Sequence, residues 1–150
     1  MDGEARDIVK EGIVSEVYPE RHSARVTFED KADLVSAELP IMTLCAQDNK
    51  FYSMPDVGET VICLFATNDG TSGEGWIIGS RFHDKSVPNA KKQDVTRIDF
   101  KDGTNIEYDR KSHAMKIELK GTLEITCDRE IKITSKSNVI IRGATIQLNE

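Results

Sequence analysis

Residues 115–143, MKIELKGTLEITCDREIKITSKSNVIIRG, repeat an apolar pattern every eight residues. Two ladders of apolar residues share this period: Met115, Leu123, Ile131 and Val139 in the first, and Ile117, Ile125, Ile133 and Ile141 in the second. A polar residue separates the members of each of the first three pairs, and polar or glycine breaks follow each pair. Alternation within a pair and a break after it indicate a short β-strand followed by a corner, repeated along the chain.

One chain winding at so short a period cannot enclose its own core, because each strand offers only two or three apolar side chains on one face. Three chains wound together would bury both ladders centrally and pair one another's strand edges. A third position of the repeat shrinks from Leu119 through Cys127 and Ser135 to Gly143, which would suit a tapering shaft. The pattern predicts a triple-stranded β-helix, or β-prism, formed by a homotrimer around the eight ladder residues. The alternative is an ordinary antiparallel meander packed on the N-terminal domain, which explains the alternation but not the fixed period.

The last repeat is less regular than the others. Ile140 occupies a position where a polar residue is expected, and Ile146 and Leu148 take the apolar role after Gly143. We expect Ile140, Ile146 and Leu148 to contact a tip or cap formed by another protein.

Short runs of alternating polarity also recur through residues 8–80. We expect strands at 12–18, 24–28, 34–39, 61–66 and 76–79, with Val35, Ala37 and Leu39 on one face of the third. The glycine-rich residues 68–75 are interpreted as a flexible connection before the last of these strands. Five strands in this length predict an OB-fold-like Greek-key barrel, partly open.

Residues 81–94 contain a proline, few apolar residues and no periodicity, so they are interpreted as a linker. The predicted chain is all-β: an OB-fold-like barrel at 8–80, the linker at 81–94, and a trimeric β-helix stalk with the octad repeat at 95–150. Residues 96–100 and 105–108 flank the turn residues 101–104 and predict a hairpin at the start of the stalk.

The composition, with 38% hydrophobic and 31% charged residues, is that of a folded protein exposed to water. The polar and acidic residues 1–7 do not resemble a signal peptide, so synthesis in the cytoplasm is expected. Three widely spaced cysteines, without a CxxC pair, indicate neither a disulfide framework nor a zinc site. Cys63 lies within an apolar run and is expected in the core.

The sequence does not indicate an enzyme. His22, His83 and His113 fall in turns or in the linker, without metal-ligand spacing, and are expected to be solvated. No carboxylate is embedded in an apolar run that would raise its pKa for acid catalysis. We therefore expect no catalytic residue, no cofactor and no bound metal.

Several stretches together resemble the family of phage baseplate assembly protein V, the central spike of contractile tails, and the related VgrG proteins of type VI secretion. They are residues 11–15, 25–28, 54–61, the glycine-rich loop followed by 75–79, and 98–104. The order of barrel, linker and octad-repeat prism is similar to that family as well.

This resemblance implies a structural role in a virion or a phage-tail-like extracellular particle. The homotrimer would dock on the baseplate hub protein and touch the target envelope only transiently, as sheath contraction drives it through. Some members carry a His-x-His segment that binds iron at the tip. This sequence has no histidine after His113, so the resemblance implies no tip metal and a separate PAAR-like tip protein.

Two other functions are weighed against this one. An OB-fold nucleic-acid-binding module relies on a basic groove with aromatic residues for stacking. Residues 1–94 instead hold ten Lys and Arg against seventeen Asp and Glu, and Phe28, Phe65 and Trp76 lie in apolar strands typical of a core, so no nucleic-acid partner is expected. A β-helical glycan depolymerase would need an acidic pair in a groove, for which the stalk is too short.

Overall fold

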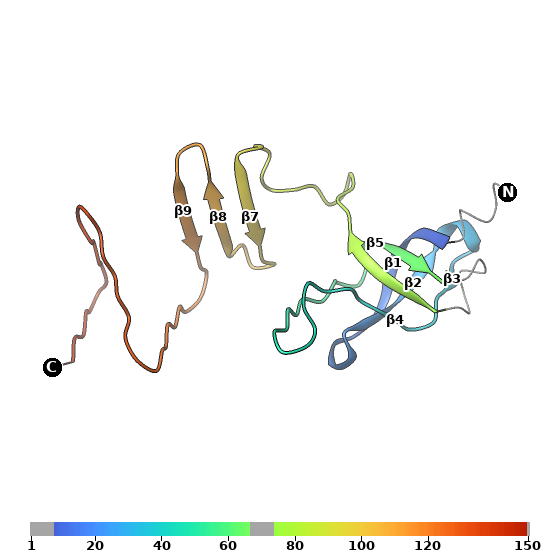
Figure 1. Ribbon diagram of the computed structural model, residues 1–150. Coiled ribbons are helices and arrows are strands. Elements are labelled where there is room, and N and C mark those ends of the chain that lie inside the picture. Colours follow the sequence, from blue (N-terminus) through green and yellow to red (C-terminus); the bar gives the residue numbers. More distant parts are fainter. Residues whose placement is uncertain (1–7, 67–73, 150) are drawn as a thin grey trace. The chain divides into compact units, whose positions relative to one another are not determined.

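A computed structural model describes residues 8–66 and 74–149 (Figure 1). The chain divides into two compact units, Met1–Asn89 and Ala90–Glu150. The division point lies inside the segment 81–94 that the sequence predicts as a linker. Each unit contains one antiparallel sheet, and the regular structure of the described residues is almost entirely strand. The all-β prediction is confirmed.

The first unit is built on a six-stranded sheet in which β3, β2, β1, β5 and β6 follow one another and β4 pairs with β2. Its strands are β1 (Val9–Tyr18), β2 (Ser23–Phe28), β3 (Leu34–Val35), β4 (Leu39–Pro40), β5 (Thr60–Phe65) and β6 (Gly75–Ser80). Two 3-10 turns, η1 (Pro19–Arg21) and η2 (Glu29–Lys31), follow β1 and β2. Strands β1, β2, β5 and β6 therefore form where alternating polarity predicted strands.

This sheet does not close into a barrel. β4 pairs with β2, with Leu39 opposite Ala24. Just after β4, Ile41 forms an isolated parallel bridge with Ile77 of β6. The Met42 amide donates a hydrogen bond to the Ile77 carbonyl at 2.9 Å. These contacts bring the end of β4 beside β6, but the two strands are not paired along their length.

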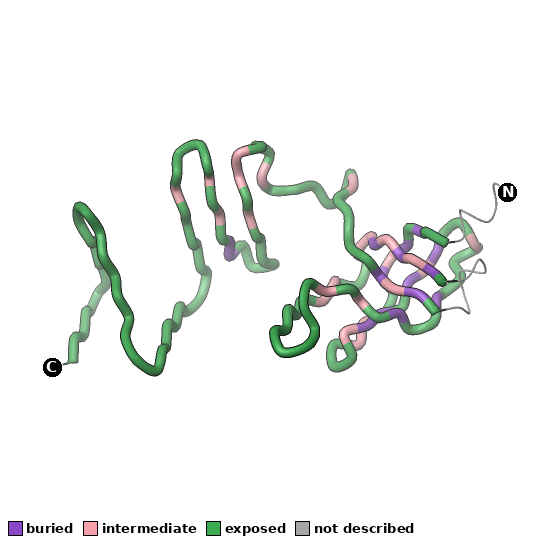
Figure 2. Tube along the Cα trace, viewed as in Figure 1, coloured by how far each residue is buried: buried purple, intermediate pink, exposed green. Residues whose placement is uncertain are grey.

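Alternating apolar residues fill the core of the first unit, as the spacing predicts. Val26, Phe28, Cys63 and Phe65 are buried together, and the buried hydrophobic residues in the described part of the chain lie in this unit's strands (Figure 2). The rings of Phe28 and Phe65 meet edge to face with their centroids 5.8 Å apart. β1 passes close over this cluster at Gly12, where a Cβ would collide with the side chains of Val26 and Phe28.

The predicted strand at 34–39 was wrong as a single element, because Ser36 turns inward between β3 and β4. Its hydroxyl accepts a hydrogen bond from the Val26 amide at 3.0 Å and donates one to the Ala37 carbonyl at 2.6 Å. The Ser36 hydroxyl thus takes the place of a backbone carbonyl as the acceptor for the Val26 amide, while the Ser36 amide still donates to the Val26 carbonyl at 2.8 Å. Val35 and Ala37 are exposed while Leu39 is buried, so the three do not share a face.

Trp76 was also wrongly predicted as a core residue. In β6 the inward positions are Gly75 and Ile77, which leaves Trp76 only partly buried on the other face. The glycine-rich connection predicted at 68–75 falls mostly on residues 67–73, which lie outside the described part of the chain.

The second unit begins with a three-stranded antiparallel sheet in the order β7–β8–β9. Its strands are β7 (Val95–Asp99), β8 (Asn105–Asp109) and β9 (Ala114–Glu118). The predicted hairpin is present as β7–β8. Its turn is closed by Asp102, whose carboxylate accepts a hydrogen bond from the Thr104 amide at 2.9 Å, and by Gly103, which has a φ of +91°.

Residues 119–149 form no strand pairing within the chain and are exposed throughout (Figure 2). In the described part of the second unit the buried residues are Thr104 and Asn105, both polar. An antiparallel meander, the alternative to the repeat, is therefore present at 95–118 but does not continue through the ladders. The second unit has no apolar core of its own among its described residues.

Candidate interaction surface

The structure leaves all eight predicted ladder residues in contact with solvent. Met115 and Ile117 lie on β9, and the other six lie on the extended segment 119–149. Their exposed fractions run from 51% for Val139 to 71% for Ile133. Within one chain, therefore, the two ladders do not pack into a core.

So much exposed apolar surface on one segment makes it a candidate interaction surface. Removing a side chain of this size from water contributes about 1.5–3 kcal/mol, and contiguous apolar surface marks an interaction site or an aggregation liability. Lys116, Glu124 and Lys132 stand between the ladder positions, so they point to the other side of the extended chain. The segment is thus apolar on one side and charged on the other, as a buried interface strand would be.

The three residues predicted to contact a tip protein are exposed as well, from 53% for Ile146 to 87% for Leu148. Ile140 stands between the ladder residues Val139 and Ile141, so both sides of the chain are apolar at that point. The apolar surface around Ile140 is therefore wider than the ladder residues alone would make it.

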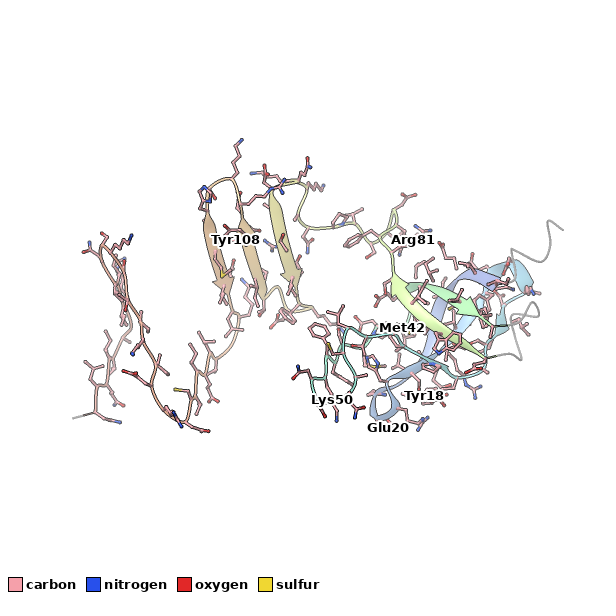
Figure 3. All side chains as sticks on the ribbon, in the orientation of Figure 1. Tyr18, Glu20, Met42, Lys50, Arg81 and Tyr108 are labelled. Carbon is pink, nitrogen blue, oxygen red and sulfur yellow. The ribbon has the colours of Figure 1, made fainter. Side chains whose placement is uncertain are left out.

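The sheet of the second unit has one apolar face that continues from the ladders. Residues directly opposite each other in neighbouring strands share a face. Two rows cross the three strands on this face: Ile98–Ile106–Ile117 and Thr96–Tyr108–Met115. Tyr108, on the middle strand β8, is labelled in Figure 3. Two ladder residues are therefore part of a wider apolar surface.

The other face of this sheet carries charged residues, three of which pair with one another. Arg97 donates hydrogen bonds to Glu107 at 2.6 Å and to Asp99 at 2.8 Å. These hydrogen bonds, the one to Glu107 first, raise the pKa of the Arg97 guanidinium. Arg97 and Glu107 are partly buried, whereas Ile98 and Ile106 on the apolar face are exposed. The polar face of the sheet is therefore less exposed to solvent than the apolar face.

Ile98, Phe100, Ile106 and Tyr108 are not among the predicted ladder residues, although they keep the same spacing. Ile98 and Ile106 are eight residues apart, as are Phe100 and Tyr108. Counted back in steps of eight from Met115 and Ile117, each of these four residues lies one position too early in the sequence. The turn between β8 and β9, in which His113 has a φ of +57°, absorbs the extra residue.

Side chains that could carry chemistry are dispersed. In residues 8–66 and 74–149, no three or more His, Cys, Asp and Glu side chains are placed to hold a metal ion. Burial raises the pKa of the Cys63 thiol to about 12, so this thiol stays protonated and packs as a small apolar group. The prediction that Cys63 belongs to the core is confirmed.

His22 was predicted to be solvated and is instead half-buried. Its Nδ1 lies 3.2 Å from the Ile41 carbonyl oxygen and its Nε2 lies 3.0 Å from the Ser53 carbonyl oxygen. The ring also lies 5.3 Å from that of Tyr52, centroid to centroid. His22 thus ties the β1–β2 connection to the irregular segment 41–53, which is a structural role.

A polar hollow of about 640 Å³ in the first unit is lined by residues that include Glu11 of β1 and Arg81. Arg81 binds the Glu11 carboxylate with two nitrogens, of which Nη2 lies 2.7 Å from Oε1. Hydrogen bonding from Arg81 holds the pKa of Glu11 below its usual range. Glu11 is therefore kept ionised, the opposite of what a general acid requires at neutral pH.

The helical segments in the described part of the chain are not long and apolar enough to cross a bilayer. Comparison of the chain with protein-family models gave no match, and comparison with curated proteins gave none either.

Proposed function

We propose that this chain is the subunit of a homotrimeric central spike in a contractile phage tail or a phage-tail-like injection system. The observation that carries the proposal is the pair of eight-residue ladders, exposed along a segment that forms no strand pairing of its own. The resemblance of the sequence to baseplate spike proteins supports the same function.

Three copies wound about a common axis would supply what one chain lacks. The ladders would point toward the axis, and the backbone of residues 119–149 would pair with that of its neighbours. Burying eight half-exposed apolar side chains contributes on the order of 10 kcal/mol per chain. That is comparable with the whole stability of a small domain, about 5–15 kcal/mol. Folding of the stalk would therefore depend on assembly.

Such a shaft suits a mechanical role. Load along its axis is shared among many inter-strand hydrogen bonds in three chains, and the charged side of each strand faces water. In this proposal, sheath contraction drives the tube and the spike through the envelope of the target cell, and the chain has no catalytic task.

The first unit would be the OB-fold-like barrel that docks on the baseplate hub. The order of its strands and the bridge between Ile41 and Ile77 support a Greek-key arrangement of this type. Exposed apolar residues of the segment 41–53, among them Met42, Leu44 and Phe51, offer a surface for that contact (Figure 3 labels Met42).

A separate PAAR-like protein would cap the far part of the stalk. Ile140, Ile146 and Leu148 support this part of the proposal, because they add apolar surface that the two ladders do not account for. An apolar contact of this kind would seal the last repeats against water.

The proposed function is tested by locating the chain in particles. An N-terminally epitope-tagged copy is expressed in the native host, tailed particles are purified, and the tag is located with gold-labelled antibody in electron micrographs. We expect label at the baseplate end of sheathed particles. In the variant Ile125→Asp/Ile133→Asp, with its ladders disrupted, we expect the label to be lost from particles.

Absence of the tagged chain from sheathed particles would contradict the proposal. Tight binding of single-stranded DNA at physiological salt would instead favour an OB-fold nucleic-acid-binding module. The charge of residues 1–94, with ten Lys and Arg against seventeen Asp and Glu, opposes that alternative, because an acidic module repels a phosphate backbone.

A further inference from the structure

We infer that the apolar face of the β7–β8–β9 sheet is a further layer of the interface between copies of this chain, covered by a second copy. The inference rests on the proposed trimer and extends it. The interface would begin at Ile98, Phe100, Ile106 and Tyr108, well before the first ladder residue Met115.

The sheet face and the ladders form one surface. A hollow of about 690 Å³ is lined by Phe100, Ile106 and Ile117 from the sheet and by Leu119 and Leu123 from the segment that follows. The hollow, whose lining also includes Lys101, Asp102 and Thr104, therefore runs from β7–β8–β9 to the first octad. A partner that covers Leu123 would extend naturally over Ile106.

The occupant is a second copy, because the row that contains Ile98 and Ile106 ends on a ladder residue. Ile98 and Ile106 share a row with Ile117, and Ile117 is a ladder residue that faces the other copies in the trimer. A different protein covering Ile98 and Ile106 would compete with those copies for Ile117. The row is covered without conflict when the same partner spans all three strands.

The charges on the sheet exclude the opposite arrangement. Arg97 already pairs with Asp99 and Glu107 on the polar face, so that face is suited to solvent. Turning the apolar face outward would leave Ile98 and Ile106 in water and bury three charged side chains instead. The three strands therefore present the row Ile98–Ile106–Ile117 to the other copies.

Disulfide formation between copies tests this geometry. In a full-length chain carrying Cys45→Ser and Cys127→Ser, one cysteine is introduced as Ile106→Cys, and in parallel chains as Lys116→Cys or Ile125→Cys. Lys116 is the matched control, because it is exposed and lies in the same sheet but on the other face. After mild oxidation and alkylation, the chains are separated by denaturing electrophoresis without reductant.

We expect Ile106→Cys and Ile125→Cys to give a dimer band that holds at most two of every three chains, because three thiols around one axis leave one unpaired. Lys116→Cys should give none. If Ile125→Cys links and Ile106→Cys does not, the trimer stands and the sheet face is not part of it. Equal linking of Lys116→Cys and Ile106→Cys would also overturn the inference. If neither Ile106→Cys nor Ile125→Cys links and light scattering shows a monomer, the proposed trimer itself fails.

Discussion

Gly12 shows how one position controls the core of the first unit. β1 crosses the buried cluster there so closely that a Cβ would overlap the side chains of Val26 and Phe28. Both neighbours are fully buried and cannot move into solvent. Residue 12 must therefore be glycine for steric reasons, which periodicity alone does not reveal.

The substitution Gly12→Ala is expected to lower the free energy of unfolding of the first unit by about 1–3 kcal/mol, because an added methyl group overpacks the core. Gly79→Ala is the control, since nothing lies within 4 Å of its added Cβ. Denaturant unfolding followed by Trp76 fluorescence measures both. If Gly12→Ala lowers the free energy of unfolding no more than Gly79→Ala does, the core accommodates the added methyl group without losing stability.

Burial sets the reactivity of Cys63. Because burial raises the pKa of its thiol to about 12, almost no thiolate forms at pH 8, and reaction with a thiol reagent requires that thiolate. We expect Cys63 to resist labelling in the folded chain while the exposed Cys45 reacts, and to react after denaturation in guanidinium. Mass spectrometry of the labelled peptides decides the point, and equal labelling of the two residues would mean that Cys63 is accessible.

At the scale of elements, the β7–β8 turn depends on an ionised carboxylate. Hydrogen bonds from the Thr104 amide, and then from its hydroxyl, hold the pKa of Asp102 below its usual range. A carboxyl whose pKa is lower in the folded state contributes stability above its unfolded pKa, near 4. That contribution disappears as the pH falls through the lower, folded pKa.

Asp102→Asn keeps an oxygen acceptor but removes the charge. We therefore expect a lower melting temperature than that of the unmodified chain at pH 7, and a difference that shrinks as the pH falls below about 4. Asp128→Asn, which changes an exposed carboxylate outside the three strands, serves as the control. A difference at pH 3 as large as that at pH 7 would show that the charge of Asp102 does not stabilise the turn.

Elements with simple alternation could be predicted from the sequence, and elements shaped by polar side chains could not. Val26 and Phe28 alternate along β2, and both proved buried. The split of 34–39 depended on Ser36, because a serine that replaces a backbone partner looks like any other polar residue in a strand pattern. Trp76 was predicted in the core because it begins an apolar strand, whereas Gly75 and Ile77 are the buried positions of β6.

At the scale of the whole molecule, the eight-residue period is visible in the sequence, whereas the apolar face of β7–β8–β9 is not. A fixed period reveals Met115 to Ile141 directly. The earlier pairs, such as Ile98 with Ile106, keep the same spacing but stand one residue out of phase, because the turn that contains His113 shifts them. Only the pairing of β8 with β9 shows that Ile106 and Ile117 share a face.

A charged side chain should disrupt the assembly at a ladder position but be tolerated at the position next to it. Ile133→Asp would bury a carboxylate in the proposed core and is expected to dissociate the assembly, because an unpaired buried charge costs several kcal/mol. Lys132→Asp places the same side chain one position away on the charged side and should leave assembly intact. Sedimentation velocity compares the two variants, and equal behaviour would mean that the two sides of the chain are equivalent.

The central claim is that three copies bury the ladders together. Its most direct test is the mass of the unmodified chain in solution, measured by light scattering coupled to size-exclusion chromatography. The trimer predicts a single species of three times the chain mass of 16.8 kDa, unchanged on dilution. A folded species of 16.8 kDa, with residues 119–149 protected from proteolysis, would contradict it.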